Sequence, residues 1–276
     1  MAVRRIWLCA DDYGIAPGVN AAIRDLIGRK RINATSVMVS APSFDREAID
    51  ALAAVTTERQ AAIGLHVTLT APFSPLIRSF SPLRRSVFLP LGRMLVKALL
   101  RQLDRTSLAS EVEAQFAAFE RAFGRPPDFI DGHQHVQLFP QVRDAVLAAT
   151  KARAPDAWVR QCASVRSWPV LSGDPKGLLI NALSRDFRER AATLGIPTNP
   201  AFAGTYSYQP GADFGALFLR FIKGLPDGGL IMCHPGTVDE KLRALDPLTQ
   251  VREREYGYLV SEQFREMLAA AEVELI

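Results

Sequence analysis

The sequence has no long hydrophobic run, and it contains only three cysteines among 276 residues. Its uncharged stretches, such as 61–77, contain prolines and fall short of the roughly 20 apolar residues that a membrane-spanning helix needs. The apolar run near the N-terminus covers only residues 6–10, which is too short for a secretion signal. We therefore expect a cytoplasmic protein with no helix through a membrane.

The three cysteines, Cys9, Cys162 and Cys233, lie far apart, each in an apolar segment. Their odd number and their spacing fit neither a disulfide framework nor a zinc-binding cysteine motif. We expect them to be reduced thiols in the core.

Acidic residues are absent between Glu58 and Asp104, and all the charged residues of that segment are basic. The formal net charge of +4 therefore comes from one local segment and not from the protein as a whole. The segment does not show the aromatic interleaving that is typical of single-strand-binding platforms, and no nucleic-acid-binding motif occurs elsewhere. We expect no nucleic-acid partner.

Short apolar runs alternate with amphipathic stretches along the whole chain. The runs that predict strands are 6–10, 34–40, 62–70, 128–132, 157–161, 201–205, 230–233 and 273–276. Helices are expected between them, including 107–123, which stops at Gly124, and 253–271. This alternation predicts an α/β fold with seven or eight parallel strands, most simply closed into a barrel and forming a single domain over residues 1–276. An open doubly wound sheet is the alternative, because periodicity does not show whether the sheet closes.

Residues 71–106 interrupt the regular spacing and are interpreted as an insertion on one face. Within them, 91–103 predicts an amphipathic helix on which Arg93, Lys97 and Arg101 recur every fourth residue. Such a helix suits either a lid packed on the barrel or a peripheral contact with a membrane surface.

All four histidines of the chain fall at the carboxyl ends of predicted strands: His66, His133, His135 and His234. Asp11 and Asp12 end the first predicted strand in the same way. Because these strand ends converge on one mouth in a parallel βα fold, we expect the acids and imidazoles to meet there.

One carboxylate with two imidazoles is a ligand set for a catalytic divalent metal ion with open positions. Each motif alone also has an ordinary structural interpretation. The Asp11–Asp12 pair is also typical of a turn or a helix cap, and His66 could be a hydrogen-bonded core residue. His133 and His135 could be two strand residues that face solvent. The joint placement at strand ends favours the metal site.

Four segments resemble the YdjC-like carbohydrate deacetylases, the ChbG/HpnK family. They are ADDYGIAPGVN at 10–20, GLHVTL at 64–69, DGHQHV at 131–136 and CHPG at 233–236. The resemblance implies a distorted (β/α) barrel that removes acetyl groups from N-acetylglucosamine-containing molecules with one divalent metal ion, Mg²⁺ or Zn²⁺.

Carried over residue by residue, the resemblance implies Asp12, His66 and His133 as metal ligands, Asp11 as general base and His234 as general acid. The chain departs from the family pattern at two positions: Tyr13 replaces the commoner Phe, and Gln137 stands where many members have a further histidine.

Three further residues are candidates for substrate contact or support. His135 suits a fourth ligand, a substrate contact or a neutral structural imidazole, and we favour the substrate contact; it shares a face with His133 if the segment is extended. Asp131 suits a carboxylate that orients an imidazole, or merely a turn acid. Arg160 suits a contact with substrate or with an acid, or a surface ion pair.

The sequence therefore predicts a hydrolase acting on an amino-sugar substrate, either an oligosaccharide or a glycolipid. The alternatives are a metal-dependent hydrolase of another bond, such as a different amide, an ester or a phosphoester, and a non-catalytic sugar-binding protein that retains the metal. The absence of a Gly-rich phosphate loop disfavours phosphoryl chemistry. The oligomeric state is not determined by the sequence, and a homodimer stays open.

Overall fold

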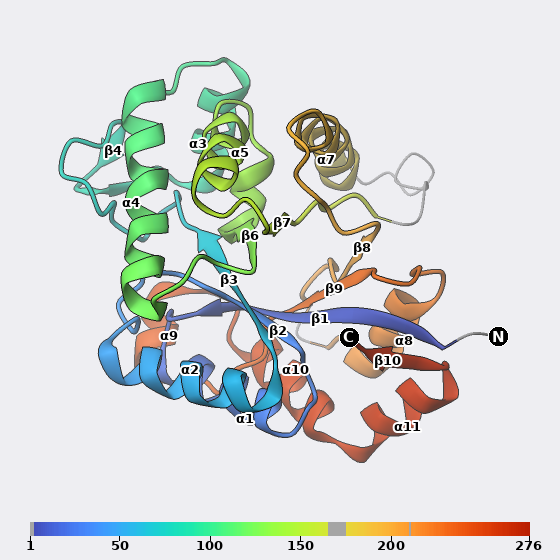
Figure 1. Ribbon diagram of the computed structural model, residues 1–276. Coiled ribbons are helices and arrows are strands. Elements are labelled where there is room, and N and C mark those ends of the chain that lie inside the picture. Colours follow the sequence, from blue (N-terminus) through green and yellow to red (C-terminus); the bar gives the residue numbers. More distant parts are fainter. Residues whose placement is uncertain (1–2, 165–174, 210) are drawn as a thin grey trace.

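The computed structural model describes residues 3–164, 175–209 and 211–276. At its centre, parallel strands form a curved sheet in the order β7-β6-β3-β2-β1-β9-β8, and β10 pairs with the start of β1. Helices surround this sheet (Figure 1). The strands are β1 (Arg4–Tyr13), β2 (Ala34–Val37), β3 (Ala62–Val67), β6 (Phe129–Gly132), β7 (Trp158–Val159), β8 (Phe202–Ala203), β9 (Leu230–Cys233) and β10 (Val273–Leu275).

The curvature brings the two edges of the sheet, β7 and β8, towards each other. Isolated parallel bridges join Val159 to Thr198 and Ser164 to Phe202 across this gap. The predicted distorted (β/α) barrel is confirmed, and the alternative of an open doubly wound sheet is wrong. Because the edge strands are only two residues long, the closure is much less regular than in a symmetrical barrel.

The helices follow the signals of the sequence closely at several ends. Pro17 begins α1. Helix α4 starts after Asp104, whose carboxylate accepts a hydrogen bond from the Ser107 backbone N–H. The same helix ends at Gly124, which has a φ of 67°. The helices are α1 (Pro17–Gly28), α2 (Arg46–Arg59), α3 (Leu91–Leu99), α4 (Arg105–Phe123), α5 (Val142–Arg153), α7 (Pro175–Thr193), α8 (Phe214–Ile222), α9 (Glu240–Leu245), α10 (Gln250–Val260) and α11 (Glu262–Ala270), with a 3-10 turn, η1 (His133–Leu138). Within the described ranges, none of them is long and apolar enough to cross a membrane.

One predicted helix is wrong in its length. The stretch 253–271 was expected to be continuous, but it divides between α10 and α11 at Ser261. The Ser261 backbone is extended, and its side chain accepts a hydrogen bond from the Phe264 N–H, so this serine caps the second helix.

The segment 71–106 forms a short hairpin, β4 (Leu83–Arg84) with β5 (Val87–Phe88), followed by α3. The buried carboxylate of Glu111 on α4 accepts hydrogen bonds from the backbone N–H groups of Leu76 and Ile77 and so fastens this segment to α4. The expected helix 91–103 is too long, because α3 ends at Leu99 and Arg101 follows with φ of 55°. Arg101 is therefore not part of a basic stripe on the helix.

Candidate active site

The carboxyl ends of the strands open into a cavity of about 280 Å³. Its polar lining includes every histidine of the chain together with Asp11 and Asp12. Its apolar lining comes from α3, α7, the end of η1, β9 and the segment between α9 and α10. The residues are Leu91, Leu95, Leu138, Phe139, Leu179, Ile180, Leu183, Met232 and Leu248. The segments that sequence analysis expected to converge are therefore brought together at one mouth.

A bulge in β1 directs both aspartates to this mouth. Neighbouring residues of a regular strand point to opposite faces. Here the register with β2 shifts between Ala10 and Tyr13, and Asp12 has φ of 69°. Bulges of this kind re-aim side chains next to active sites. Asp11 and Asp12 consequently both line the cavity although they are adjacent in the chain.

The side chains of Asp12, His66 and His133 form a compact group whose candidate ligand atoms all lie within 4.8 Å of one another. Asp12 Oδ1 lies 3.3 Å from His66 Nε2 and 2.9 Å from His133 Nδ1. One carboxylate and two imidazoles, nearly buried at a cavity floor, suit a borderline divalent cation. The residues present therefore fit the metal that the sequence predicts.

Hydrogen bonds at Nδ1, the nitrogen that points away from Asp12, orient the His66 ring. Its Nδ1 lies 2.6 Å from Asp131 Oδ1 and 2.9 Å from Ser36 Oγ, so Nε2 is the nitrogen directed to Asp12. Burial disfavours a charged imidazole, but Asp131 and Asp12 outweigh it and raise the pKa of His66 to about 10. A carboxylate behind a ligating imidazole fixes its orientation and increases its basicity. Asp131 occupies the position expected of an imidazole-orienting acid.

Asp11 is held by Arg160, which is completely buried. Nη1 of Arg160 lies 2.6 Å from one Asp11 oxygen, and Nη2 lies 2.6 Å from the other and 2.6 Å from Asp131 Oδ2. Burial opposes ionisation, but the Arg160 guanidinium lowers the pKa of Asp11 to about 2. Because Arg160 has no exposed surface, the interpretation as a surface ion pair is wrong. Its guanidinium pairs with Asp11 and Asp131 and also lies 3.0 Å from Cys9 Sγ.

Arg252 on α10 pairs with Asp12 through a single contact. Its Nη2 lies 2.6 Å from Asp12 Oδ2, and it also pairs with Asp246. Burial opposes the charge of Asp12, and Arg252 and His133 nevertheless hold its pKa well below the usual range. Sequence analysis missed Arg252, because it lies in a helix crowded with charges where nothing distinguishes it from a solvated residue.

His133 and His135 do not lie in an extended segment. They form part of η1, in which Gln134 and His135 have φ of 56° and 61°. Gly132 precedes this turn, and a Cβ there would come within 2.7 Å of Gln137 Oε1. The expectation of a shared strand face therefore does not apply, although both histidines line the cavity.

His135 lies in apolar surroundings. Its Nδ1 is 3.5 Å from Cys162 Sγ, and its ring makes an edge contact with Phe202. Burial and then the charge of Arg160 lower the pKa of His135 to about 3, so the imidazole is neutral. It is not part of the compact group formed by Asp12, His66 and His133.

His234 directly follows β9, the strand that pairs with β1, and lines the same cavity. Its backbone N–H donates to Glu255 Oε2 at 2.5 Å, and Glu255 Oε1 accepts from the Tyr206 hydroxyl. The ring of Tyr208 makes an edge contact with the imidazole ring of His234. Nδ1 of His234 is buried without a hydrogen-bond partner among the described residues. Glu255 fixes the backbone of His234 and was missed by sequence analysis, because its own sequence context is an ordinary charged helix.

The parallel barrel with acids and imidazoles at its mouth has the architecture of the barrel deacetylases of carbohydrates. The sequence matches the YdjC-like protein family over residues 5–270, and the chain belongs to this family. It is 27% identical over 246 residues to proteins described as chitooligosaccharide deacetylase from Yersinia pestis (strain Pestoides F) and Yersinia pseudotuberculosis serotype O:3 (strain YPIII), covering 84% of this chain and 82% of each relative.

Solved structures show the same fold. A putative cellobiose-phosphate cleavage protein from Enterococcus faecalis V583 superposes with a TM-score of 0.77 at 20% identity, covering 100% of this chain and 97% of the other. The Bc1960 peptidoglycan N-acetylglucosamine deacetylase superposes with a TM-score of 0.52 at 9% identity, covering 99% of this chain and 85% of the other.

Proposed function

We propose that this chain is a metal-dependent carbohydrate deacetylase that hydrolyses the N-acetyl group of an N-acetylglucosamine-containing molecule. The observation that carries the proposal is the group Asp12, His66 and His133 flanked by two further candidates for proton transfer, Asp11 and His234, in one cavity. The similarity to chitooligosaccharide deacetylases supports the choice of an acetylated amino sugar as substrate.

Asp12, His66 and His133 would hold the metal ion, Mg²⁺ or Zn²⁺. When bound, it supplies a Lewis acid that polarises the amide carbonyl and lowers the pKa of water. Asp131 and Ser36 keep the Nδ1 side of His66 occupied, so the Nε2 side is the one available as a ligand.

Asp11 accepts a proton from the attacking water. A carboxylate with a pKa of about 2 is ionised throughout the neutral range and needs no prior deprotonation, but it is a weaker proton acceptor than a base with a pKa near neutral. The two-point contact with Arg160 fixes the position of the Asp11 carboxylate.

His234 delivers a proton to the leaving amine. An amine leaves poorly unless it is protonated, and an imidazole is suited to protonation near neutral pH. Asp11 and His234 each follow a paired residue of the neighbouring strands β1 and β9, and both line the cavity. His135, a neutral imidazole in the cavity wall, contacts the substrate through a hydrogen bond and carries no charge.

The apolar wall supports a glycolipid over a free oligosaccharide. A sugar chain offers hydroxyl groups along its whole length, and aliphatic side chains such as Leu91 and Leu95 of α3 and Ile180 and Leu183 of α7 leave those groups unpaired. An alkyl or polycyclic group beside the amino sugar would bury the same surface favourably.

Acetate release tests the function and the acceptor together. Purified protein, loaded with Mg²⁺ or Zn²⁺, is incubated with N-acetylglucosamine bearing a short alkyl aglycone and, separately, with diacetylchitobiose. Release from either substrate that chelation abolishes supports the deacetylase, and a higher kcat/KM for the alkyl glycoside supports the glycolipid. Binding of both substrates without acetate release supports the sugar-binding alternative, and release of a different group supports a different hydrolase.

The exposed side of α3 supports a peripheral contact of this segment with a membrane surface. Leu91 and Leu95 face the cavity, whereas Val96, Leu99 and Leu100 are 54%, 45% and 61% exposed. A helix with one apolar side on the cavity and another towards solvent would place the cavity mouth next to the lipid that carries the substrate.

A further inference from the structure

A second pocket lies at the other end of the barrel from the active site. We call it the basal pocket, and its volume is about 420 Å³. It is lined by Trp7, Thr56, Thr57, Gln60, Ala61, Ala62, Arg125, Asp128 and Trp158. Ala62 and Trp158 are the first residues of their strands and Asp128 immediately precedes β6, so the pocket is at the amino ends of the strands. Nothing in the catalytic proposal uses it.

One side of the basal pocket is aromatic. The rings of Trp7 and Trp158 are 5.8 Å apart, and Trp158 stacks on Phe129 at 4.5 Å with an angle of 11° between the rings. Phe129 in turn occupies the space beside Gly64, where a Cβ would come within 2.4 Å of its ring. The indoles are therefore supported by the barrel interior, and both remain partly exposed at the pocket.

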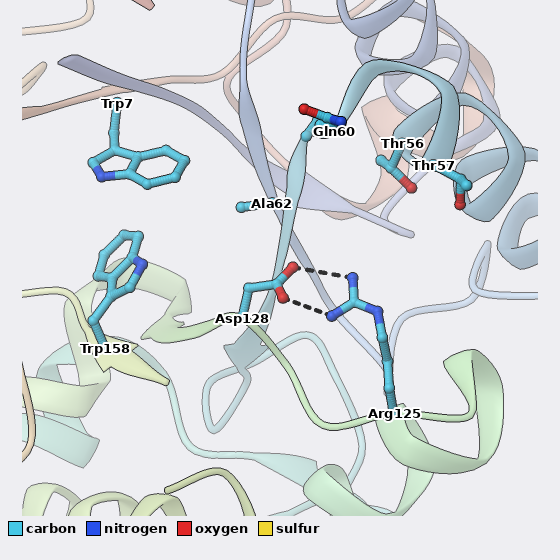
Figure 2. Close-up of a pocket in the computed structure, with 9 residues that line it drawn as sticks. Trp7, Thr56, Thr57, Gln60, Ala62, Arg125, Asp128 and Trp158 are labelled. Carbon is cyan, nitrogen blue, oxygen red and sulfur yellow. Dashed lines mark hydrogen bonds and ion pairs between the residues drawn. The ribbon is translucent and has the colours of Figure 1, made fainter. Parts of the chain in front are cut away.

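The opposite side is polar and pre-arranged. Arg125 makes a two-point ion pair with Asp128, with nitrogen–oxygen distances of 2.7 and 3.0 Å. Asp128 is itself anchored because its Oδ2 accepts a hydrogen bond from the Ile63 backbone N–H. Figure 2 shows the two indoles on one side of the pocket and the Asp128–Arg125 pair on the other, with Ala62 between them.

The chemistry of this lining selects its ligand. Arg125 and Asp128 neutralise each other and are the only charged groups among the described residues that line the pocket, so a phosphate or another strongly charged ligand gains little here. An indole offers an apolar surface with an N–H at its edge, and an ion pair offers both donors and acceptors. A pyranose ring matches this combination, because it has apolar C–H faces and a rim of hydroxyl groups.

We propose that the basal pocket is a non-catalytic binding site for a neutral pyranose unit of an oligosaccharide. Its volume falls in the range of pockets that hold small ligands. The pyranose packs against the indole side while its hydroxyls bond to Arg125, Asp128 and the exposed hydroxyl of Thr57. The site is separate from the cavity at the strand carboxyl ends, so it binds sugar whether or not the chain deacetylates it.

Tryptophan indole resonances provide a local test. The chain has three tryptophans. Trp7 and Trp158 line the basal pocket and not the active-site cavity, and Trp168 lies outside the described residues. The protein is labelled with ¹⁵N, its indole N–H signals are assigned with Trp7→Phe and Trp158→Phe, and triacetylchitotriose is added to millimolar concentration. Sorbitol, which has hydroxyl groups but no ring, serves as the control ligand.

We expect saturable shifts of the Trp7 and Trp158 signals with triacetylchitotriose and none with sorbitol. Arg125→Gln should weaken this binding about tenfold, because it removes charged donors from the site. The matched control is Arg121→Gln, which removes an exposed arginine of α4 outside the pocket and should leave the affinity unchanged. The proposal is overturned if the Trp7 and Trp158 signals do not move, or if Arg125→Gln leaves the affinity at the wild-type value. The two indoles would then only pack against the barrel. Acetate release is not part of this readout, so the basal site and the deacetylase fail or succeed separately.

Discussion

Arg160 and Asp11 form a buried two-point ion pair in which both nitrogen–oxygen distances are 2.6 Å. The same guanidinium reaches Asp131, which orients His66. One arginine thus connects the candidate base to the carboxylate that supports a candidate metal ligand. Burying three charges is costly unless they are paired, so each member of this group depends on the others.

Replacing Arg160 should affect both stability and the pH dependence of catalysis. Arg160→Gln leaves two buried carboxylates without their counter-charge, and we expect the free energy of unfolding to fall by about 3–5 kcal/mol. Because Arg160 lowers the pKa of Asp11, its loss raises that pKa, and the acidic limb of kcat/KM moves to higher pH. Urea unfolding and a pH–rate profile measure the two effects.

A matched control separates the two effects of the Arg160 variant. Arg143 on α5 is also buried and pairs with Asp186, but it does not line the active-site cavity. Arg143→Gln should lower stability and leave the acidic limb where it is. An acidic limb that also stays in place in folded Arg160→Gln would show that Arg160 does not set the ionisation of the base.

The proposed metal ligands can be tested without catalysis. His66→Ala and His133→Ala each remove one of three protein ligands, and we expect both purified variants to lose the metal on dialysis at neutral pH. His135→Ala is the control, because His135 lies outside the compact group and should leave the metal bound. Elemental analysis gives the metal content. Stoichiometric metal in both ligand variants contradicts the assignment.

The two adjacent aspartates should differ in their effects. Asp11→Asn removes the base and keeps the ligand group, so we expect turnover to fall about 10²–10⁴-fold with full metal content. Asp12→Asn alters a ligand and should lose both. Turnover and metal content are measured on the same samples. An Asp11→Asn variant with near-native turnover excludes this residue as the base.

His234 should be needed for turnover and not for metal binding. It lies outside the group of close ligand atoms, so His234→Ala should keep the metal while its rate falls about 10²–10⁴-fold. Turnover and metal content are measured on wild type and variant, and near-native turnover in metal-loaded His234→Ala would remove His234 from the proton transfer.

Much of the fold and of the site could be predicted because the signals are local. Strand ends at Cys233 and Gly132 follow from short apolar runs with turn residues after them, and parallel topology then brings His133 and His234 to one mouth. The family resemblance added the roles, and the structure groups the donor atoms of Asp12, His66 and His133.

The remaining features depend on contacts between distant segments. The bulge that turns Asp12 into the cavity depends on the register between β1 and β2, which the motif does not reveal. Arg252 lies 240 positions after Asp12, and no periodic pattern relates the two. The turn at His135 was interpreted as extended, because the pattern alone does not show the positive φ angles of Gln134 and His135.

The last prediction concerns the exposed side of α3. Arg93 and the partly buried Lys97 remain on this helix, whereas Arg101 lies beyond its end, so the basic stripe is shorter than the sequence suggested. The exposed apolar residues Leu99 and Leu100 provide the other half of a membrane contact. We expect weak binding to anionic vesicles that decreases with salt, because the electrostatic part is screened over about 10 Å at 0.1 M salt.

Vesicle co-sedimentation at low and high ionic strength measures this binding. The double variant Leu99→Ser with Leu100→Ser should reduce binding at both salt concentrations, because it removes apolar area, whereas Arg93→Gln with Lys97→Gln should reduce it mainly at low salt. Arg121→Gln on α4 is the matched charge control and should bind like wild type. Turnover of a soluble substrate should change little in all of them, since none of these side chains lines the active-site cavity. If the wild-type protein stays in the supernatant at low ionic strength, the membrane contact is excluded and α3 serves only as a wall of the cavity.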